Sequence, residues 1–265
     1  MFIAPFTLED LDELPELEPA DYDMMMARLR WHMTTPYATV IKSVFGEALT
    51  SALAMAVWHN GSGWIGDRLM MPRFQGPELE GQLLDALMQE LHTNHCTTVT
   101  ALVEEASMPV FTSRGFEPEA VYLCYAGGQS EAPTLDEVEL FEPHHSMGVL
   151  HLDRSASGED RRVLISEHFY ASRIYVEKGR VRGNYMPLLG EGLLLADRAD
   201  VGEELLRWHL PHVQEIWIPD TNAVAKEFLE LRGYTVHDRR DRMRHGAKLP
   251  WRPEFNYGWI SERLG

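Results

Sequence analysis

Apolar residues recur along the first half of the chain with the periods of strands and helices. Two of the apolar runs, 51–59 and 64–71, are joined by Asn60-Gly61-Ser62-Gly63, which is typical of a hairpin turn. Segment 77–93 instead repeats leucines at helical spacing. The pattern predicts strands at 1–7, 37–45, 51–59, 64–71, 97–103 and 116–125, and helices at 8–18, 20–33, 77–93 and 108–114.

The second half repeats this order of elements without repeating the residues themselves. Here the pattern predicts helices at 158–169, 199–210 and 222–231, and strands at 173–178, 181–189, 192–196, 215–219 and 234–244. Between the halves, an acidic stretch with glycines and prolines interrupts the pattern. We therefore predict two mixed α/β domains in tandem, at 1–128 and 148–265, joined by an acidic linker at 129–147. Each is expected to hold a mainly antiparallel sheet flanked by helices.

Charge is distributed unevenly between the halves. The chain has a formal net charge of −17, and residues 1–128 hold 18 acidic against 6 basic side chains. Such a field repels nucleic acid and anionic membranes and attracts cations. It favours a cationic small molecule or a basic peptide as partner, although solubility alone also explains it.

Two cysteines, Cys96 and Cys124, are too few for a disulfide framework and lack the spacing of a metal site. Histidine pairs such as His144 with His145 have no third ligand at a recognisable spacing, so no metal is expected. With neither a membrane-length apolar run nor a signal peptide, a cytoplasmic location is expected. The sequence leaves homodimer formation open.

Several motifs, taken in order, resemble the GNAT superfamily of acyl-CoA-dependent N-acyltransferases. Segment 63–76, GWIGDRLMMPRFQG, is similar to the family's fourth strand and the glycine-rich loop after it. Segments 112–117 and 228–234 look like a later helix-to-strand corner in each half. Arg161 and the segment Tyr257-Gly258-Trp259 are similar to residues found in one bacterial branch of the family. Proteins of that branch have two domains in tandem, of which the second is degenerate.

The resemblance implies that acetyl-CoA is the co-substrate and that an acetyl group passes directly to an amine. Backbone N–H groups at the helix start would hold the pyrophosphate, and strand residues would hold the pantetheine arm. The carrier residues implied are Leu69, Met70, Met71, Gln75, Gly76, Leu79 and Gly81. Asp67 is the candidate for binding or deprotonating the amine. Since neighbours on a strand face opposite ways, either Asp67 or Arg68 is expected to face solvent.

Several residues depart from the family's pattern. Pro77 has no N–H to donate, while Glu78 and Glu80 stand at the second and third glycine positions of the loop. Phe111 and Leu229 stand where the family often has a proton-donating tyrosine. In the second half, carboxylates occupy the corresponding helix start, namely Asp197, Asp200 and Glu203. The alternative is therefore a catalytically inactive protein that binds or interacts through the same fold.

Overall fold

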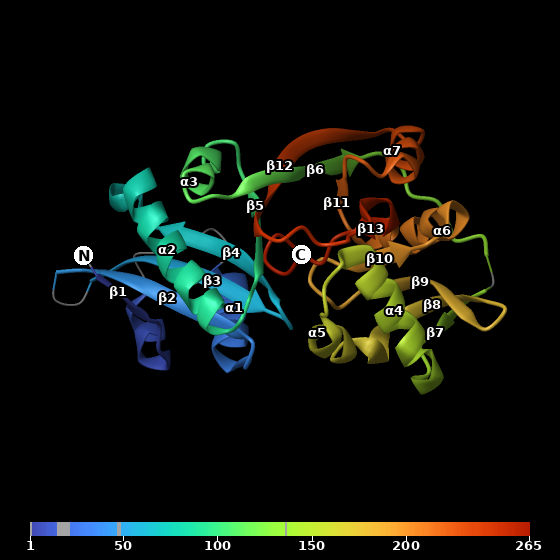
Figure 1. Cartoon of the computed structure of the whole chain (residues 1–265). Helices are drawn as coiled ribbons and strands as arrows, with labels where there is room; N and C mark the ends of the chain where they lie inside the picture. Colours follow the sequence, from blue (N-terminus) through green and yellow to red (C-terminus); the bar gives the residue numbers. More distant parts are fainter. Residues whose placement is uncertain (1, 15–21, 47–48, 136) are drawn as a thin grey trace. The chain divides into compact units, whose positions relative to one another are not determined.

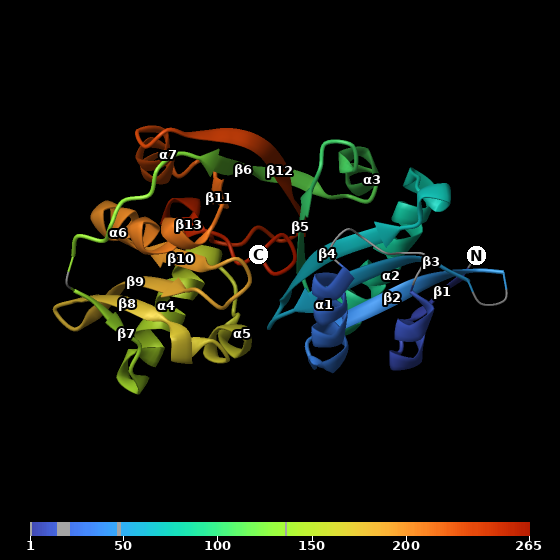
Figure 2. The same cartoon turned by 180° about the vertical axis from the view of Figure 1, so that it is seen from behind.

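The structure is a computed structural model that describes residues 2–14, 22–46, 49–135 and 137–265 (Figures 1 and 2). Its chain divides into two compact units. Unit 1 comprises Met1–Glu117, Met243–Ala247 and Glu262–Leu264, and unit 2 comprises Pro118–Arg242, Lys248–Ser261 and Gly265. These units are not contiguous halves, because two short segments from the end of the sequence belong to unit 1. Among the described residues, no helix is long and apolar enough to cross a bilayer.

Unit 1 is built around a mixed sheet with the strand order β1-β2-β3-β4-β5, followed by the end of β12. Neighbouring strands are antiparallel from β1 to β4, whereas β4 and β5 are parallel. The bounds are Phe2–Pro5 for β1, Ala38–Phe45 for β2, Leu49–Trp58 for β3, Ser62–Met70 for β4, Thr98–Val103 for β5 and Tyr234–Gly246 for β12.

Both faces of this sheet are covered, and β3 shows how its sequence specifies this. Helix α2, Pro77–Thr93, packs against one face, where Ala52, Ala54 and Ala56 are buried. The intervening Leu53 and Met55 are buried with α1, Tyr22–Thr34, on the other face. Figures 1 and 2, seen from opposite sides, show one helix on each face. A strand covered on both sides reads as a continuous apolar run, as β3 does.

The chain continues from β5 through helix α3, Met108–Thr112, into β6, Glu117–Gly127. The expected helix at 8–18 is present as a 3-10 helix over Leu8–Glu13, and residues 15–21 lie outside the described part of the chain. This 3-10 helix begins with a capping box, in which Asp10 accepts a hydrogen bond from the N–H of Thr7.

Unit 2 contains a five-stranded sheet in the order β13-β10-β9-β8-β7, antiparallel throughout. The bounds are Val138–Leu140 for β7, Arg173–Glu177 for β8, Arg180–Met186 for β9, Leu193–Ala196 for β10 and Asn256–Gly258 for β13. Helices α6, Ala199–His209, and α7, Ala223–Glu230, bury their apolar residues in the same core. A second set of strands, in the order β12-β6-β11, includes β11, Glu215–Pro219.

One helix of unit 2 differs from the sequence prediction. A helix was expected to begin at Gly158, but this glycine, at φ 75°, closes helix α4, Ser146–Ser157. A left-handed residue ends a helix without strain only when it lacks a side chain, so glycine is a terminator here. The next helix, α5, covers only Arg162–Ser166. The segment expected as a linker carries β7, which pairs with β8.

Candidate functional site

The candidate site of unit 1 begins where β4 and β5 separate. Their parallel pairing runs from Ser62 opposite Thr98 to Ile65 opposite Ala101. On the other side of β4, the pairing with β3 shifts, so that Gly66 and Asp67 together face a single residue of β3. This is a β-bulge, which turns side chains and backbone groups out of the regular ladder and is frequent at active sites. The bulge therefore re-aims Asp67 at the point where the strands part.

Asp67 does not face open solvent, as one alternative had it. Its carboxylate is 14 % exposed and accepts a hydrogen bond from the guanidinium of Arg263, which is 17 % exposed. Gly66 makes room for this residue, because a Cβ at position 66 would lie 3.3 Å from the Cβ of Arg263. The sequence prediction missed Arg263, since nothing in the sequence links a residue near the end of the chain to β4.

A buried histidine of α1 lies near this ion pair. The ring Nδ1 of His32 is 2.9 Å from the carbonyl oxygen of Arg28, so Nδ1 carries the proton and donates it. Nε2 is then the atom with the lone pair, and it has no hydrogen-bond partner in the described part of the chain. Burial lowers the pKa of His32, while the charges of Asp67 and Arg263 act on it in opposite directions. The imidazole is thus neutral, and of its two ring nitrogens only Nε2 lacks a hydrogen-bond partner among the described residues.

Arg68 and Glu80 form the next part of the site. The guanidinium Nε of Arg68 is 3.2 Å from Glu80 Oε1, and Nη1 donates to the carbonyl oxygen of Gly66 at 3.0 Å. The same guanidinium lies over the ring of Phe111, 4.9 Å from its centroid. Arg68 therefore neutralises the carboxylate that stands at the loop's third glycine position. It also covers one face of Phe111, the residue that stands where the family often has a tyrosine.

The start of α2 is open at its cap and filled in its first turn. Gly76 is the N-cap residue, and a Cβ there would have no atom within 4 Å. Glu80 N–H makes the first intrahelical bond, to the carbonyl of Gly76. Further in, a Cβ on Gly81 would lie 2.1 Å from a guanidinium nitrogen of Arg114, whose Nε is held by Asp85 at 2.7 Å. Arg114 therefore covers the helix above Gly81.

The expected carrier residues differ in their exposure to solvent. Gln75 is exposed and Gly76 is partly exposed, whereas Met71, Leu79 and Gly81 are buried. Leu69 and Met70 are half-buried on opposite faces of β4, packing with the α1 and α2 cores respectively. Pro77 and Glu78 are exposed in the first turn, as ordinary helix-start residues are.

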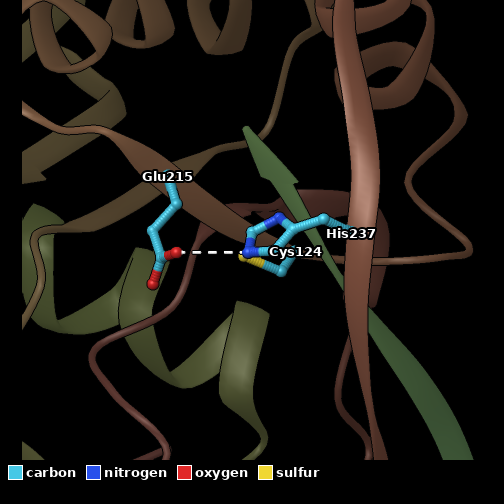
Figure 3. Close-up of side chains that lie close together, drawn as sticks. All are labelled: Cys124, Glu215 and His237. Carbon is cyan, nitrogen blue, oxygen red and sulfur yellow. Dashed lines mark hydrogen bonds and ion pairs between the residues drawn. The ribbon is translucent and has the colours of Figure 1, made fainter. Parts of the chain in front are cut away.

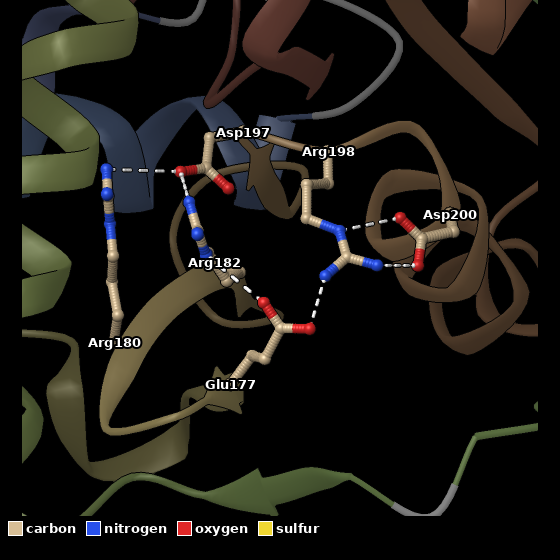
Figure 4. Close-up of polar contacts among 6 residues, drawn as sticks. All are labelled: Glu177, Arg180, Arg182, Asp197, Arg198 and Asp200. Atoms are coloured by element: carbon tan, nitrogen blue, oxygen red, sulfur yellow. Dashed lines mark hydrogen bonds and ion pairs between the residues drawn. The ribbon is translucent and has the colours of Figure 1, made fainter.

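The corresponding helix start in unit 2 is closed by ion pairs (Figure 4). Arg198 is the N-cap residue of α6, and its guanidinium is bonded to Glu177 at 2.7 Å and to Asp200 at 3.0 Å. Asp197 accepts a bond from Arg182 at 2.8 Å. Two of the three carboxylates expected here, Asp197 and Asp200, are thus paired with arginines. Arg198 lowers the pKa of Asp200 and keeps it ionised. Leu229, like Phe111, is fully buried.

Comparison with known proteins identifies the fold. No protein-family model and no curated protein matches the sequence. Among solved structures, a protein of Pyrococcus horikoshii provisionally classed as an acetyltransferase is 18 % identical, with a TM-score of 0.79 over 100 % of this chain and 95 % of its own. A GCN5-related N-acetyltransferase from Sphaerobacter thermophilus is 13 % identical, with a TM-score of 0.62 over 95 % and 98 %.

A tandem GNAT protein from the clavulanic acid biosynthesis pathway is 10 % identical, with a TM-score of 0.58 over 93 % of this chain and 98 % of its own. The matches extend over nearly the whole chain, so they include both units. The fold class predicted from the sequence, a mixed α/β fold like that of the GNAT acyltransferases, is confirmed.

Proposed function

Since the chain has the fold of the GNAT N-acetyltransferases, we propose that it is an acyl-CoA-dependent N-acetyltransferase whose reaction centre lies in unit 1. The observation that carries this proposal is the separation of β4 from β5 at a bulge that presents Gly66 and Asp67. After Ile65, β4 no longer pairs with β5. The edge of β4 opposite β3 is therefore unpaired with β5 from that point. Backbone N–H groups at such an edge can hold a thioester carbonyl and the charge that develops on it.

The carrier would lie along β4 and end at the start of α2. The accessible residues there, Gln75 and Gly76, leave the helix cap open to a pyrophosphate, and the first N–H groups of a helix attract anions. The ion pair of Arg68 with Glu80 removes the repulsion expected from the Glu80 carboxylate. Pro77 donates nothing, so we expect affinity for acetyl-CoA to be weaker than an intact glycine-rich loop would provide.

The acceptor would be the amine of a cationic small molecule or a basic peptide, attracted by the negative charge of residues 1–128. Attack of the amine nitrogen on the acetyl carbon forms the C–N bond and breaks the C–S bond. The nitrogen loses a proton, and the thiolate takes one up. Asp67 supplies the negative charge that attracts the incoming ammonium. His32 lies within the field of Asp67 but is buried, so it has no direct access to the amine.

The test is release of free thiol from acetyl-CoA in the presence of a panel of polyamines, amino sugars and basic peptides. Asp67→Asn is expected to lower kcat/KM by about 100-fold or more, the usual contribution of a positioned acid or base. Asp220→Asn is the matched control, because Asp220 is an exposed carboxylate of unit 2 that is paired with Lys226. If no amine is acetylated and acetyl-CoA does not bind, the proposal fails.

One observation favours a second function, a non-catalytic protein that uses the fold for binding. The first turn of α2 is filled by side chains, with Leu79 in the core and Arg114 above Gly81. Calorimetric titration with acetyl-CoA distinguishes the two functions. Binding by the native chain supports the transferase. Binding that appears only when both Glu78 and Glu80 are replaced by glycine supports a fold that has lost its carrier.

A further inference from the structure

Three neighbouring strands of unit 2 bring a cysteine, a histidine and a glutamate together (Figure 3). Cys124 lies on β6 opposite Trp217 of β11, and Glu215 is two residues from Trp217 on the same strand. Residues two apart on a strand share a face, so Glu215 and Cys124 lie on one side of the sheet. His237 comes from β12, the neighbour of β6 on its other edge.

The distances among the three side chains match the edges of a metal-coordination tetrahedron. Cys124 Sγ is 3.7 Å from His237 Nε2, and this same Nε2 is 3.4 Å from Glu215 Oε2. With ordinary zinc bond lengths, the sulfur-to-nitrogen edge is about 3.6 Å and the nitrogen-to-oxygen edge about 3.4 Å. All three ligand atoms lie within 4.8 Å of one another.

Hydrogen bonds link the three side chains while no metal is present. The Cys124 thiol is hydrogen-bonded to Glu215, and His237 Nε2 can donate to the same carboxylate. A cation placed between the three ligand atoms would replace these hydrogen bonds and would interact favourably with all three atoms.

We propose that Cys124, Glu215 and His237 form a binding site for a zinc ion in unit 2. Thiolate, imidazole and carboxylate together are a ligand set typical of Zn²⁺, whereas Mg²⁺ and Ca²⁺ prefer oxygen ligands. Three protein ligands leave a fourth position for water. His237 and Glu215 are about half exposed, so that position is open to solvent.

Charge at the site also favours a cation. The carboxylates of Glu215 and Asp238 both place negative charge near the Cys124 sulfur. When Zn²⁺ binds, the S–H bond breaks, the proton passes to solvent, and a Zn–S bond forms. The full burial of Cys124 also argues against a nucleophilic role, because an acyl donor has no access to its sulfur.

The experiment is a titration of the full chain, free of any affinity tag and treated with a chelator, with Co²⁺ and then Zn²⁺. Cobalt is expected to give a thiolate-to-metal charge-transfer band and the intense visible bands of tetrahedral geometry, and equimolar Zn²⁺ should remove both. Absence of the charge-transfer band, or a visible spectrum of six-coordinate cobalt, would overturn the proposal.

Variants identify the ligands. Cys124→Ser should abolish the charge-transfer band. His237→Gln and Glu215→Gln should each weaken Zn²⁺ binding by at least about 100-fold, because even residues that only hydrogen-bond to a metal ligand contribute about 10-fold to 100-fold to metal affinity. Both of the latter residues are partly exposed, so their replacement leaves the core intact. Cys96→Ala and His151→Gln are the controls and should bind Zn²⁺ as the native chain does. Loss of Zn²⁺ binding in either control, or unchanged Zn²⁺ binding in His237→Gln, contradicts the assignment. None of these outcomes depends on acetyl transfer.

Discussion

The carboxylate of Asp67 is hydrogen-bonded to the guanidinium of Arg263, a residue 196 positions later in the sequence. Both side chains are largely buried, so each charge depends on the other for compensation. The pair fixes the orientation of Asp67 at the bulge of β4. In the proposed reaction, the same pair would hold this carboxylate in place for the amine.

Replacing Arg263 should therefore destabilise the protein. For Arg263→Gln we expect the free energy of unfolding to fall by about 1–3 kcal/mol, the cost of leaving a buried group unpaired. A double-mutant cycle with Asp67→Asn, measured by urea unfolding, gives the coupling energy. The exposed pair of Lys226 and Asp220 serves as control, with an expected coupling of about 0–1 kcal/mol. Equal coupling energies in the two pairs would contradict this interpretation.

Glu80 should affect stability and carrier binding in opposite directions. Glu80→Gly strands the guanidinium of Arg68, which is 11 % exposed, and should cost about 3 kcal/mol of unfolding free energy. The released guanidinium lies beside the start of α2, so acetyl-CoA should bind more tightly in calorimetry. Glu78→Gly is the control, since Glu78 is exposed and its loss should cost no more than about 1 kcal/mol. Weaker binding by Glu80→Gly would refute the proposed carrier position.

Two helical glycines should respond differently to alanine. In Gly202→Ala of α6, the new Cβ would lie 2.1 Å from the ring of Tyr257, which is buried, so we expect a loss of about 1–3 kcal/mol from overpacking. In Gly81→Ala of α2, the nearest atoms belong to the flexible end of Arg114, which can move aside. The gain of about 1 kcal/mol in helix propensity should then offset the lost contact. Thermal unfolding of both variants tests the contrast.

His209 should make the stability depend on pH. Burial lowers its pKa from 6.5 to about 4, and Nδ1 is 3.2 Å from the Tyr185 hydroxyl. Because the unfolded state takes up the proton first as pH falls, this contribution is complete above about pH 6.5 and is lost by about pH 4. It amounts to about 3 kcal/mol at most. His209→Gln should flatten the dependence in that window, whereas His151→Gln should not. Urea unfolding at stepped pH measures both slopes.

Local sequence signals predicted both ends of α2, Pro77–Thr93, to the residue. The proline at the first position marks the start of this helix, and the leucines at helical spacing mark its buried side. Asn222, which accepts a hydrogen bond from the N–H of Ala225, marked the start of α7 in the same way. By contrast, α4 was missed although Val149, Leu152, Asp153 and Ala156 are buried at helical spacing, because one of these positions is an aspartate. Its burial depends on the ion pair with Arg161, which the sequence pattern does not display.

The candidate site was only partly predictable for a similar reason. Asp67 lies in a strand whose motif can be read locally, and the structure places it at the bulge. Its partners, Arg263 and His32, lie on other elements, and a lone histidine inside a helical pattern is usually a core residue. Cys124, Glu215 and His237 come together only through the order of three strands. Sequence spacing carries no trace of such an order.

The end of β12 and the residue that follows it, Met243–Ala247, belong to unit 1. There the N–H of Ala247 bonds to the carbonyl oxygen of Thr97 beside β5. On a ribosome the first 117 residues are therefore finished long before the strand that completes their sheet. Most tandem domains fold in the order of their synthesis. Here the first unit has to wait for the end of the chain, and until then β5 presents a strand edge on which a chaperone or a second nascent chain can act.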